Sequence, residues 1–239
     1  MKITCIGTSH GVPEANRRCS SYLIEAQDKV YLIDMGTAAT ESIIARGIKP
    51  PQVSAVFITH PHGDHTDGLI QFVDLINWYF KTADPVIFVP NDRFEPAINA
   101  WLVLNGTTLR NSVQFRVTEP GVIWDDGVLR VTSCPTQHCP HSCAYLVECE
   151  GKTVLFTGDL RHPSVDYPEE AKRCTLDLAV CETAHFSPKE FLPIWETTDV
   201  KAVVHTHVSP RWHDDLDEIV AGEHKYDFCI AEDDMILEL

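Results

Sequence analysis

The chain has 239 residues, enough for one α/β domain with a large buried core and marginal for two, so we expect a single domain over residues 1–239. Its 44% hydrophobic and 23% charged residues are typical of a globular protein, and no apolar run approaches the roughly 20 residues that span a membrane. The net charge of −16, from 19 basic and 35 acidic residues, argues against a long nucleic acid as ligand, because phosphate backbones are bound through several lysines and arginines.

The N-terminus and the cysteines suggest where the protein is found. The first residues, MKITCIGTSHGVP, lack the apolar stretch of about 7–15 residues of a secretory signal, so we expect no export. Nine scattered cysteines, an odd number, suit reduced thiols better than a framework of disulfides. We therefore expect a cytoplasmic protein.

Hydrophobic periodicity predicts an alternation of strands and helices, with Asp, Ser, Thr or Pro near the start of each helix. In chain order we expect strands at 3–6, 21–25 and 30–34, a helix at 37–45, a strand at 55–59, a helix at 66–80, a strand at 86–89, a helix at 95–104, strands at 113–117, 128–133, 144–148, 153–157 and 178–181, a helix at 188–197, a strand at 201–205, a helix at 214–221 and a strand at 228–231. Hairpin-like strands followed by alternating strands and helices, in both halves of the chain, predict two mixed sheets packed face to face with helices outside.

The strongest chemical signal is the run HPHGDH, from His60 to His65, which directly follows the predicted strand at 55–59. The strand fixes the start of this run, and its proline and glycine permit a tight loop. Three imidazoles and one carboxylate within six residues then converge on a common point. Neutral imidazoles and carboxylates suit zinc, iron or manganese, and four such ligands in so short a span can serve two neighbouring ions.

A His-x-His-x-Asp-His run after a hydrophobic strand resembles the signature of the metallo-β-lactamase superfamily. That family implies a further His after a strand near mid-chain, an Asp after a strand that ends in Thr-Gly, and a last His after a late strand. His138, Asp159 and His207 occupy these places in this order. The resemblance spans roughly the whole chain and implies an α/β fold of the four-layer αββα sandwich type.

The resemblance also implies which residues hold two divalent ions. His60, His62 and His138 would hold one ion, Asp64, His65 and His207 would hold the other, and Asp159 would bridge them. Two ions about 3.5–4 Å apart can hold a water between them and lower its pKa toward neutrality, so the implied reaction is hydrolysis. Asp64 would also orient the nucleophilic hydroxide. We expect zinc, with manganese or iron as alternatives, because nitrogen and oxygen ligands accept all three.

The third histidine ligand has an alternative, since His141 lies three residues after His138. The family places a Gly-Tyr pair slightly closer to its histidine than Ala144 and Tyr145 lie to His138. We expect His138 to be the ligand and keep His141 as the alternative.

Three other histidines lie near predicted ligands or family loops. His205 precedes His207 by two residues on the last predicted strand but one, and we expect it to pack or to form a hydrogen bond, with metal binding as the alternative. His10 follows a loop that the family commonly places near the metals. We interpret His10 and His213 as ordinary polar positions.

Glu182 and His185 follow the predicted strand at 178–181 and lie three residues apart. In the relatives that this segment resembles, a Glu and a His near the leaving group help to donate a proton, and a histidine held by a glutamate suits that task. The alternative is a helix start with a solvated histidine. Our candidate catalytic residues are Asp64, Glu182 and His185.

Four further runs resemble ribonuclease Z and its phosphodiesterase relatives. They are GTSHGVP from Gly7, RRCSS from Arg17, LIDMGT from Leu32 and HVSPRW from His207. In that group, enzymes that process the 3′ end of tRNA carry a long tRNA-grasping arm between the mid-chain histidine and the bridging aspartate. Here the interval from His138 to Asp159 has room only for two strands and a turn.

We therefore expect hydrolysis of a small-molecule ester, a phosphodiester whose oxygens the metal pair and Arg211 clamp. A tRNA 3′-processing endonuclease and a thioester or lactone hydrolase are the alternatives. A non-enzymatic binding protein is a third class, against which the intact Asp64 and Asp159 argue.

The aromatic residues 78–80 and Trp101 bear on oligomeric state. We interpret them as core packing. A cap over a pocket or a homodimer interface is the alternative.

Overall fold

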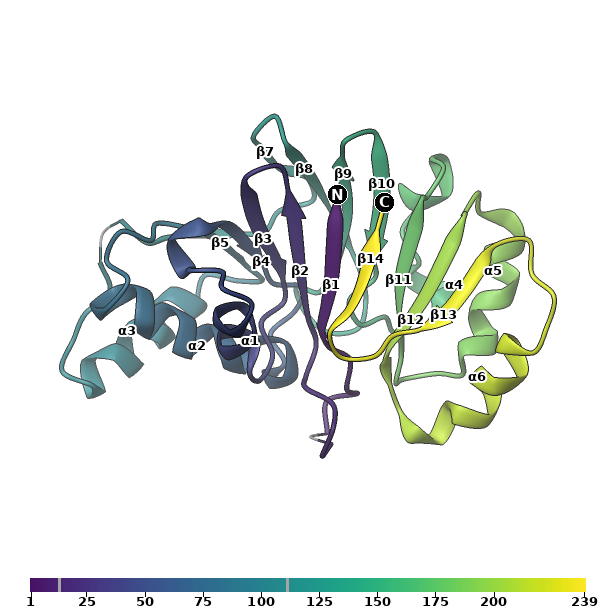
Figure 1. The fold of residues 1–239 in the computed structure, drawn as a ribbon, viewed down its shortest axis with the longest axis horizontal. Helices are drawn as coiled ribbons and strands as arrows, with labels where there is room; N and C mark the ends of the chain where they lie inside the picture. The colour runs from purple at the N-terminus through teal and green to yellow at the C-terminus, as the bar shows by residue number, and fades with distance from the viewer. Residues whose placement is uncertain (13, 111) are drawn as a thin grey trace.

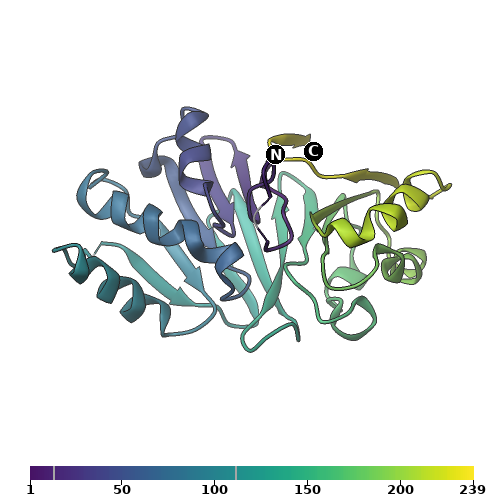
Figure 2. The same cartoon turned by 90° about the horizontal axis from the view of Figure 1, so that it is seen from below.

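The structure of the protein is a computed structural model that describes residues 1–12, 14–110 and 112–239. Two seven-stranded sheets lie face to face, and helices cover the outer face of each sheet (Figures 1 and 2). These four layers confirm the predicted α/β fold and αββα sandwich. Pro13, part of the N-terminal run that resembles ribonuclease Z, lies outside the described residues. No helix in the described ranges has the length and hydropathy needed to cross a membrane.

The first sheet has the strand order β14-β1-β2-β3-β4-β5-β6, antiparallel from β14 to β3 and parallel from β3 to β6. Its strands are β1 (Lys2–Gly7), β2 (Ser21–Ala26), β3 (Lys29–Ile33), β4 (Val53–Phe57), β5 (Val86–Val89), β6 (Gln114–Val117) and β14 (Met235–Glu238). The helices on its outer face are α1 (Ala39–Ala45), α2 (Gly63–Trp78) and α3 (Phe94–Leu104), with the 3₁₀ turn η1 (Pro50–Gln52) before β4.

The second sheet has the order β13-β12-β11-β10-β9-β8-β7, parallel from β13 to β10 and antiparallel from β10 to β7. Its strands are β7 (Gly121–Asp125), β8 (Leu129–Pro135), β9 (Cys143–Cys149), β10 (Lys152–Phe156), β11 (Leu178–Thr183), β12 (Ala202–Val208) and β13 (Asp227–Ile230). Its helical segments are α4 (Pro163–Asp166), α5 (Leu192–Thr197) and α6 (His213–Val220), with the 3₁₀ turns η2 (Ala171–Arg173), η3 (Pro188–Phe191) and η4 (Pro210–Trp212).

The central core lies between the sheets and is held by aromatic contacts across them. The Phe57 ring of β4 stacks on Phe88 at 5.1 Å and meets the edge of Tyr145, from the second sheet, at 5.8 Å. One further core lies between the first sheet and its helices, and another lies between the second sheet and its helices. A central strand is therefore buried on both faces. In β2, Ile24 belongs to the central core and Leu23 to the helix-side core. This double burial explains why these strands are almost continuously apolar.

β7 and β14 are absent from the predicted strands, because in both of them several side chains are exposed and the apolar pattern is weak. The second helix starts earlier than the sequence pattern predicted. α2 begins at Gly63, so Asp64 and His65 lie in the first helical turn rather than in a loop. An acidic side chain there is favoured by the helix dipole, and the Thr66 hydroxyl donates a hydrogen bond to the His62 carbonyl oxygen at 2.9 Å.

The core-packing interpretation of the aromatic residues is wrong for three of them. Trp78, Tyr79 and Trp101 have exposed fractions of 50%, 63% and 48%. Trp78 is the last residue of α2, Tyr79 directly follows it, and Trp101 lies on α3. Phe80 does pack against the helix-side core. The pocket cap and the homodimer interface stay predictions.

Asp126, in the turn between β7 and β8, joins the second sheet to β3 of the first. Its Oδ2 accepts hydrogen bonds from Lys29 Nζ and from the Tyr31 hydroxyl, each at 2.8 Å. Its Oδ1 accepts the backbone N–H groups of Val128 and Leu129 at 3.0 Å. Desolvation alone would raise the pKa of Asp126, but these bonds, that from Lys29 above all, lower it to about 2.

We expect Asp126→Asn to reduce the free energy of unfolding by about 1–2 kcal/mol near neutral pH. Because the folded-state pKa of about 2 lies below the unfolded value of about 4, this contribution is complete above about pH 4 and disappears as the pH falls through about 2. Urea denaturation of wild type and variant, at about pH 7 and about pH 2, measures the difference.

Asp125→Asn is the matched control, since Asp125 is exposed and pairs with the exposed Arg130 at 2.8 Å. We expect it to change stability by less than about 0.5 kcal/mol at either pH. A difference between wild type and Asp126→Asn that stays constant with pH would contradict the role of the Asp126 charge.

Candidate metal centre

The seven predicted ligands come from separate parts of the chain and meet at one edge of the sandwich. They follow β4, begin α2, lie in the loop after β8, follow β10 and end β12. Their ligand atoms form two groups, in each of which all atoms lie within 4.8 Å of one another. The groups are His60, His62, His138 and Asp159, and Asp64, His65, Asp159 and His207. Asp159 belongs to both groups.

In the first group the ring nitrogens of three histidines face one another. His62 Nδ1 lies 3.0 Å from His60 Nε2 and 3.2 Å from His138 Nε2. Asp159 Oδ2 lies 3.5 Å from His60 Nε2 and 3.6 Å from His138 Nε2. Burial, together with the neighbouring charge of His65, lowers the pKa of His60 to about 2, which keeps this imidazole neutral, as metal coordination requires.

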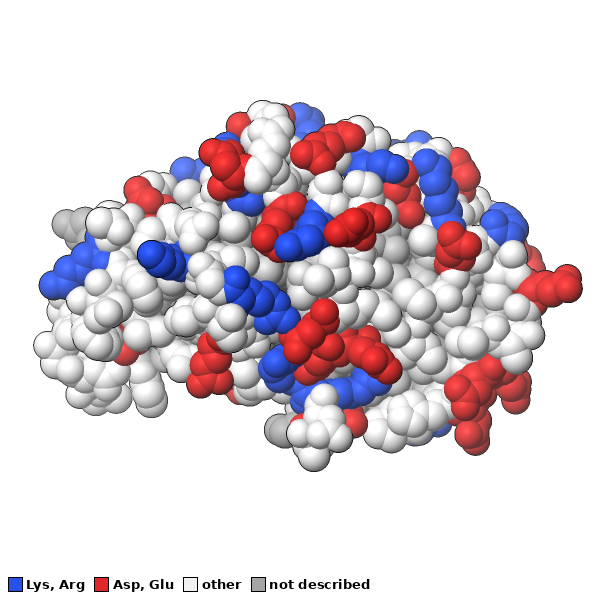
Figure 3. All heavy atoms as spheres, viewed as in Figure 1, with Lys and Arg blue, Asp and Glu red and all other residues white. Residues whose placement is uncertain are grey.

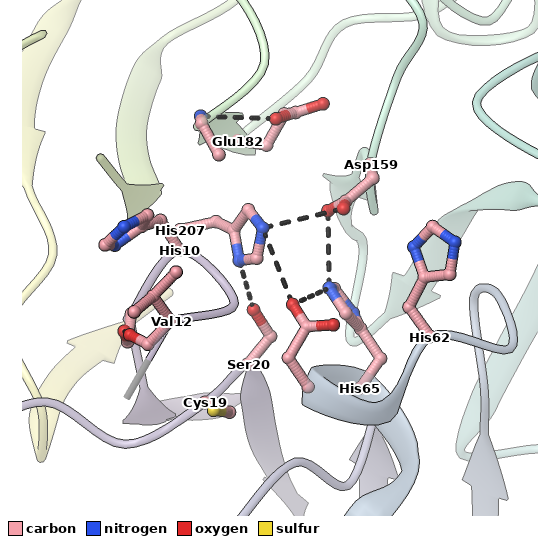
Figure 4. A network of polar contacts seen from close by, with 12 residues as sticks. His10, Val12, Cys19, Ser20, His62, His65, Asp159, Glu182 and His207 are labelled. Carbon is pink, nitrogen blue, oxygen red and sulfur yellow. Dashed lines mark hydrogen bonds and ion pairs between the residues drawn. The ribbon is translucent and has the colours of Figure 1, made fainter. Parts of the chain in front are cut away.

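The second group is drawn in Figure 4, where His207, Asp159 and His65 point toward a common centre. His65 Nε2 lies 3.3 Å from both Asp64 Oδ2 and Asp159 Oδ1. His207 Nε2 lies 3.7 Å from Asp64 Oδ2 and 3.5 Å from Asp159 Oδ2.

Two observations show that these residues suit divalent ions. Ligand atoms about 2.0–2.1 Å from one ion, at tetrahedral angles, stand roughly 3.3 Å apart, which is close to the separations above. In addition, the buried atoms His65 Nε2 and Asp159 Oδ1 have no hydrogen-bond partner among the described residues. A buried polar atom without a partner costs about 1–3 kcal/mol, and a cation between the two atoms would supply one.

Asp34 orients His65, although it was not among the predicted site residues. Its Oδ2 lies 2.7 Å from His65 Nδ1, while the backbone N–H and hydroxyl of Thr59 donate to the same carboxylate. In the neutral ring that metal coordination requires, a proton on His65 Nδ1 leaves the lone pair of Nε2 directed at the second group. Burial by itself lowers the pKa of His65, but the carboxylates of Asp159 and Asp34 outweigh it and raise that pKa. The run LIDMGT, which resembles ribonuclease Z and contains Asp34, was a signal in the sequence that could have identified this residue.

Ser20 orients His207 as Asp34 orients His65, because the Oγ atom of Ser20 lies 2.8 Å from His207 Nδ1 (Figure 4). His207 itself has a φ of 52°, a left-handed conformation that residues other than glycine rarely adopt. This turn of the backbone breaks the alternation of β12 and directs the side chain into the second group. The run RRCSS contained Ser20, but nothing in the sequence paired it with His207.

His205 lies outside both groups and packs on the helix side of β12. Its ring is 5.7 Å from that of Phe191 and 5.0 Å from that of Phe228. Burial lowers the pKa of His205 to about 3, so the ring stays neutral. The expectation that His205 packs agrees with this position.

The loop after β1 covers the second group, and a residue distant in the chain, Asp233, holds this loop through hydrogen bonds. A Cβ on Gly11, whose φ is +84°, would lie only 3.0 Å from Asp64 Oδ2. Asp233, near the C-terminus, accepts hydrogen bonds from the Thr8 hydroxyl at 2.8 Å and the Arg18 backbone N–H at 2.7 Å. His10 lies in this loop and pairs with Glu14 at 3.0 Å.

The remaining histidines lie outside both groups. His141 is exposed, in a turn where its φ is 67°, whereas His138 contacts His62. This geometry favours His138 over His141 as the third histidine ligand. His213 is exposed at the start of α6.

Glu182 and His185 form a pair beside the two groups. The Glu182 carboxylate is buried and lies 2.7 Å from His185 Nδ1, and His185 Nδ1 lies 3.8 Å from Asp159 Oδ2. Burial, with the nearby Asp159 charge, raises the pKa of Glu182 to about 7, and the hydrogen bond to Glu182 raises the pKa of His185 to about 8. His185 therefore combines a held Nδ1 with a partly exposed ring at the edge of the site.

The sequence of the chain is similar to those of known proteins. A family model described as the metallo-beta-lactamase superfamily matches residues 16–190. The chain is 29% identical over 170 residues to a protein of Listeria innocua named Ribonuclease Z, an alignment that covers 70% of this chain and 55% of that protein. The chain thus spans about half the length of the curated relatives it matches.

Solved structures show the same fold over almost the whole chain. The human tRNase Z, short form, has a TM-score of 0.76 at 21% identity, covering 100% of this chain and 99% of that chain. A metallo-beta-lactamase fold protein of Bacillus subtilis, YhfI, has a TM-score of 0.81 at 20% identity, covering 99% of both chains.

We expect Asp34→Asn to lower the affinity for zinc about 10–100-fold, because an amide holds the His65 ring less firmly than a carboxylate does. Competition with a chromophoric chelator measures this affinity without any assay of turnover.

Asp177→Asn is the control, since Asp177 is also buried and accepts a backbone N–H, from Thr153 at 3.0 Å, but lies at the start of β11, opposite the metal groups. We expect wild-type zinc affinity in this variant. Equal affinities in wild type and Asp34→Asn would show that Asp34 does not support a metal ligand.

Proposed function

The chain belongs to the metallo-β-lactamase superfamily, and we propose that it is a metal-dependent hydrolase that uses two divalent ions, zinc first, to cleave a small phosphodiester. The observation that carries this proposal is the position of Asp159, whose carboxylate faces both groups of ligand atoms. A carboxylate shared in this way suits a pair of neighbouring ions rather than one isolated ion. Manganese or iron are the alternatives to zinc.

Bound at these residues, the ions would lower the pKa of a water toward neutrality and neutralise charge on the phosphate oxygens. Asp64 would accept a hydrogen bond from that water and fix its direction of attack. Glu182 holds His185 at Nδ1 and leaves its Nε2 to carry a proton toward the oxygen of the leaving alcohol. His185 is charged near neutral pH when its pKa is about 8, as proton donation requires.

A small diester is favoured over tRNA by the chain between His138 and Asp159. This interval contains only β9 and β10, joined by a turn at Glu150 and Gly151, which leaves no space for a tRNA-grasping arm. On the face seen in Figure 3, lysines and arginines stand beside aspartates and glutamates rather than forming a continuous basic surface. The similarity to proteins named Ribonuclease Z keeps tRNA 3′ processing as the second candidate.

We expect the protein loaded with zinc or manganese to hydrolyse bis(para-nitrophenyl) phosphate faster than the monoester or a thioester. Removal of metal with a chelator should abolish this activity, and return of the metal should restore it. Asp64→Ala should lower kcat/KM at least about 100-fold, because it removes both a ligand and the group that orients the water. Release of para-nitrophenol gives the rates.

Asp74→Ala, almost three turns further along α2, is the control for helix stability and should keep wild-type rates. Turnover of the thioester alone would replace the diesterase proposal with a thioesterase. Cleavage of a tRNA precursor, with binding that weakens steeply as salt rises, would favour the second candidate instead.

A further inference from the structure

Side chains outside the two ligand groups fix the rings of three ligand histidines. The Thr59 hydroxyl lies 3.0 Å from His60 Nδ1, and the partners described above hold the rings of His65 and His207 in the same way. Among the described residues, the ring nitrogens of His138 contact only other ligand side chains. The position of His138 therefore depends on the backbone of the loop that carries it.

A buried carboxylate at the end of α4, that of Asp166, holds this loop. Asp166 Oδ2 accepts the backbone N–H of Gln137, the residue directly before His138, at 2.7 Å. The same oxygen accepts the N–H of Arg161 at 2.9 Å, and Oδ1 accepts that of His162 at 3.1 Å. One carboxylate thus joins the loop after β8 to the loop after β10.

These three N–H groups compensate for the burial of the carboxylate. Asp166 is 7% exposed, and among the described residues no charged side chain pairs with it. Hydrogen bonds from N–H groups to an ionised carboxylate are stronger than those between neutral groups, and they replace the water that burial removes. The carboxylate and the two loops therefore hold one another in place.

The loop after β10 is the better fixed of the two loops. The Leu160 N–H, directly after Asp159, donates to the buried carboxylate of Glu182 at 2.5 Å. By contrast, the hydrogen bonds of Thr136 to Ser142, at 3.0 Å from its N–H and 2.8 Å from its hydroxyl, stay within the loop after β8. Without the carboxylate at the end of α4, the loop after β8 is therefore the one that shifts.

We propose that Asp166 is a positioning residue for His138, which it places in the first group by holding the backbone of the preceding residue. The inference rests on the proposed two-ion function and adds to it a residue outside both ligand groups. A residue that merely stabilised the fold would support both groups alike, whereas Asp166 acts on the first group alone.

Zinc affinity, measured for both ions by competition with a chromophoric chelator, tests this role without turnover. His138→Ala identifies which of the two binding steps belongs to the first group. We expect Asp166→Ala to weaken that step about 10–100-fold and to leave the other step within about twofold of wild type. Asp166→Asn, which keeps one acceptor oxygen, should weaken the same step less, and it carries the comparison if Asp166→Ala does not fold.

A double variant separates positioning from general support of the fold. In His138→Ala, the further change Asp166→Ala should alter zinc affinity by less than about twofold, because the ligand through which Asp166 acts is gone. The control Asp177→Ala removes another buried carboxylate that accepts a backbone N–H, from Thr153, and should keep both affinities.

Equal weakening of both steps by Asp166→Ala, or the same loss with and without His138, would overturn the role of Asp166. Selective weakening in a protein that hydrolyses no diester would contradict the diesterase function and leave the role of Asp166 standing. A wild-type protein that binds no zinc, manganese or iron would contradict both.

Discussion

The buried carboxylate of Asp159 is the constraint on which the rest of the site depends. Its oxygens lie 3.3–3.6 Å from ring nitrogens of His60, His65, His138 and His207. Burial alone would raise its pKa, but the neighbouring histidines, His207 first, hold that pKa well below the usual range. A buried anion is stable only when opposite charge or polar groups directed at it compensate for the lost water, so the segments that bring these four histidines together must be fixed.

Rigid elements and hydrogen bonds fix them. His60 follows a strand buried on both faces, and His65 lies in the first turn of a helix packed on that strand. Asp34 and Ser20 then set the ring orientations of His65 and His207. The loop that leads to Ser20 is held in turn by Asp233, so the C-terminal segment supports the second group from 26 positions beyond His207 in the chain. Ligand orientation is thus a property of the whole sandwich.

In the proposed reaction, different segments of the chain have different functions. Strand ends would supply the ligand atoms, and the pair of Glu182 and His185 would supply a proton at the edge of the site. The short β9–β10 hairpin favours a small substrate. This hairpin contributes no ligand atom, which is why substrate preference can differ between relatives that share the fold.

The sequence by itself determined the layers of the fold and the seven candidate ligands. Apolar periodicity is a local property, and the run from His60 to His65 places four of the ligands within one strand end, so neither needed tertiary structure to be seen. The other three ligands, His138, Asp159 and His207, came from the resemblance to the metallo-β-lactamase superfamily. Tertiary structure alone decided that Asp34 and Ser20 orient those ligands, that the φ of His207 turns its side chain away from that of His205, and that Trp78 and Trp101 face outward. It also decided that the partly exposed β7 and β14 complete the sheets. These features depend on strand register and on contacts between residues far apart in the chain, which no local pattern encodes.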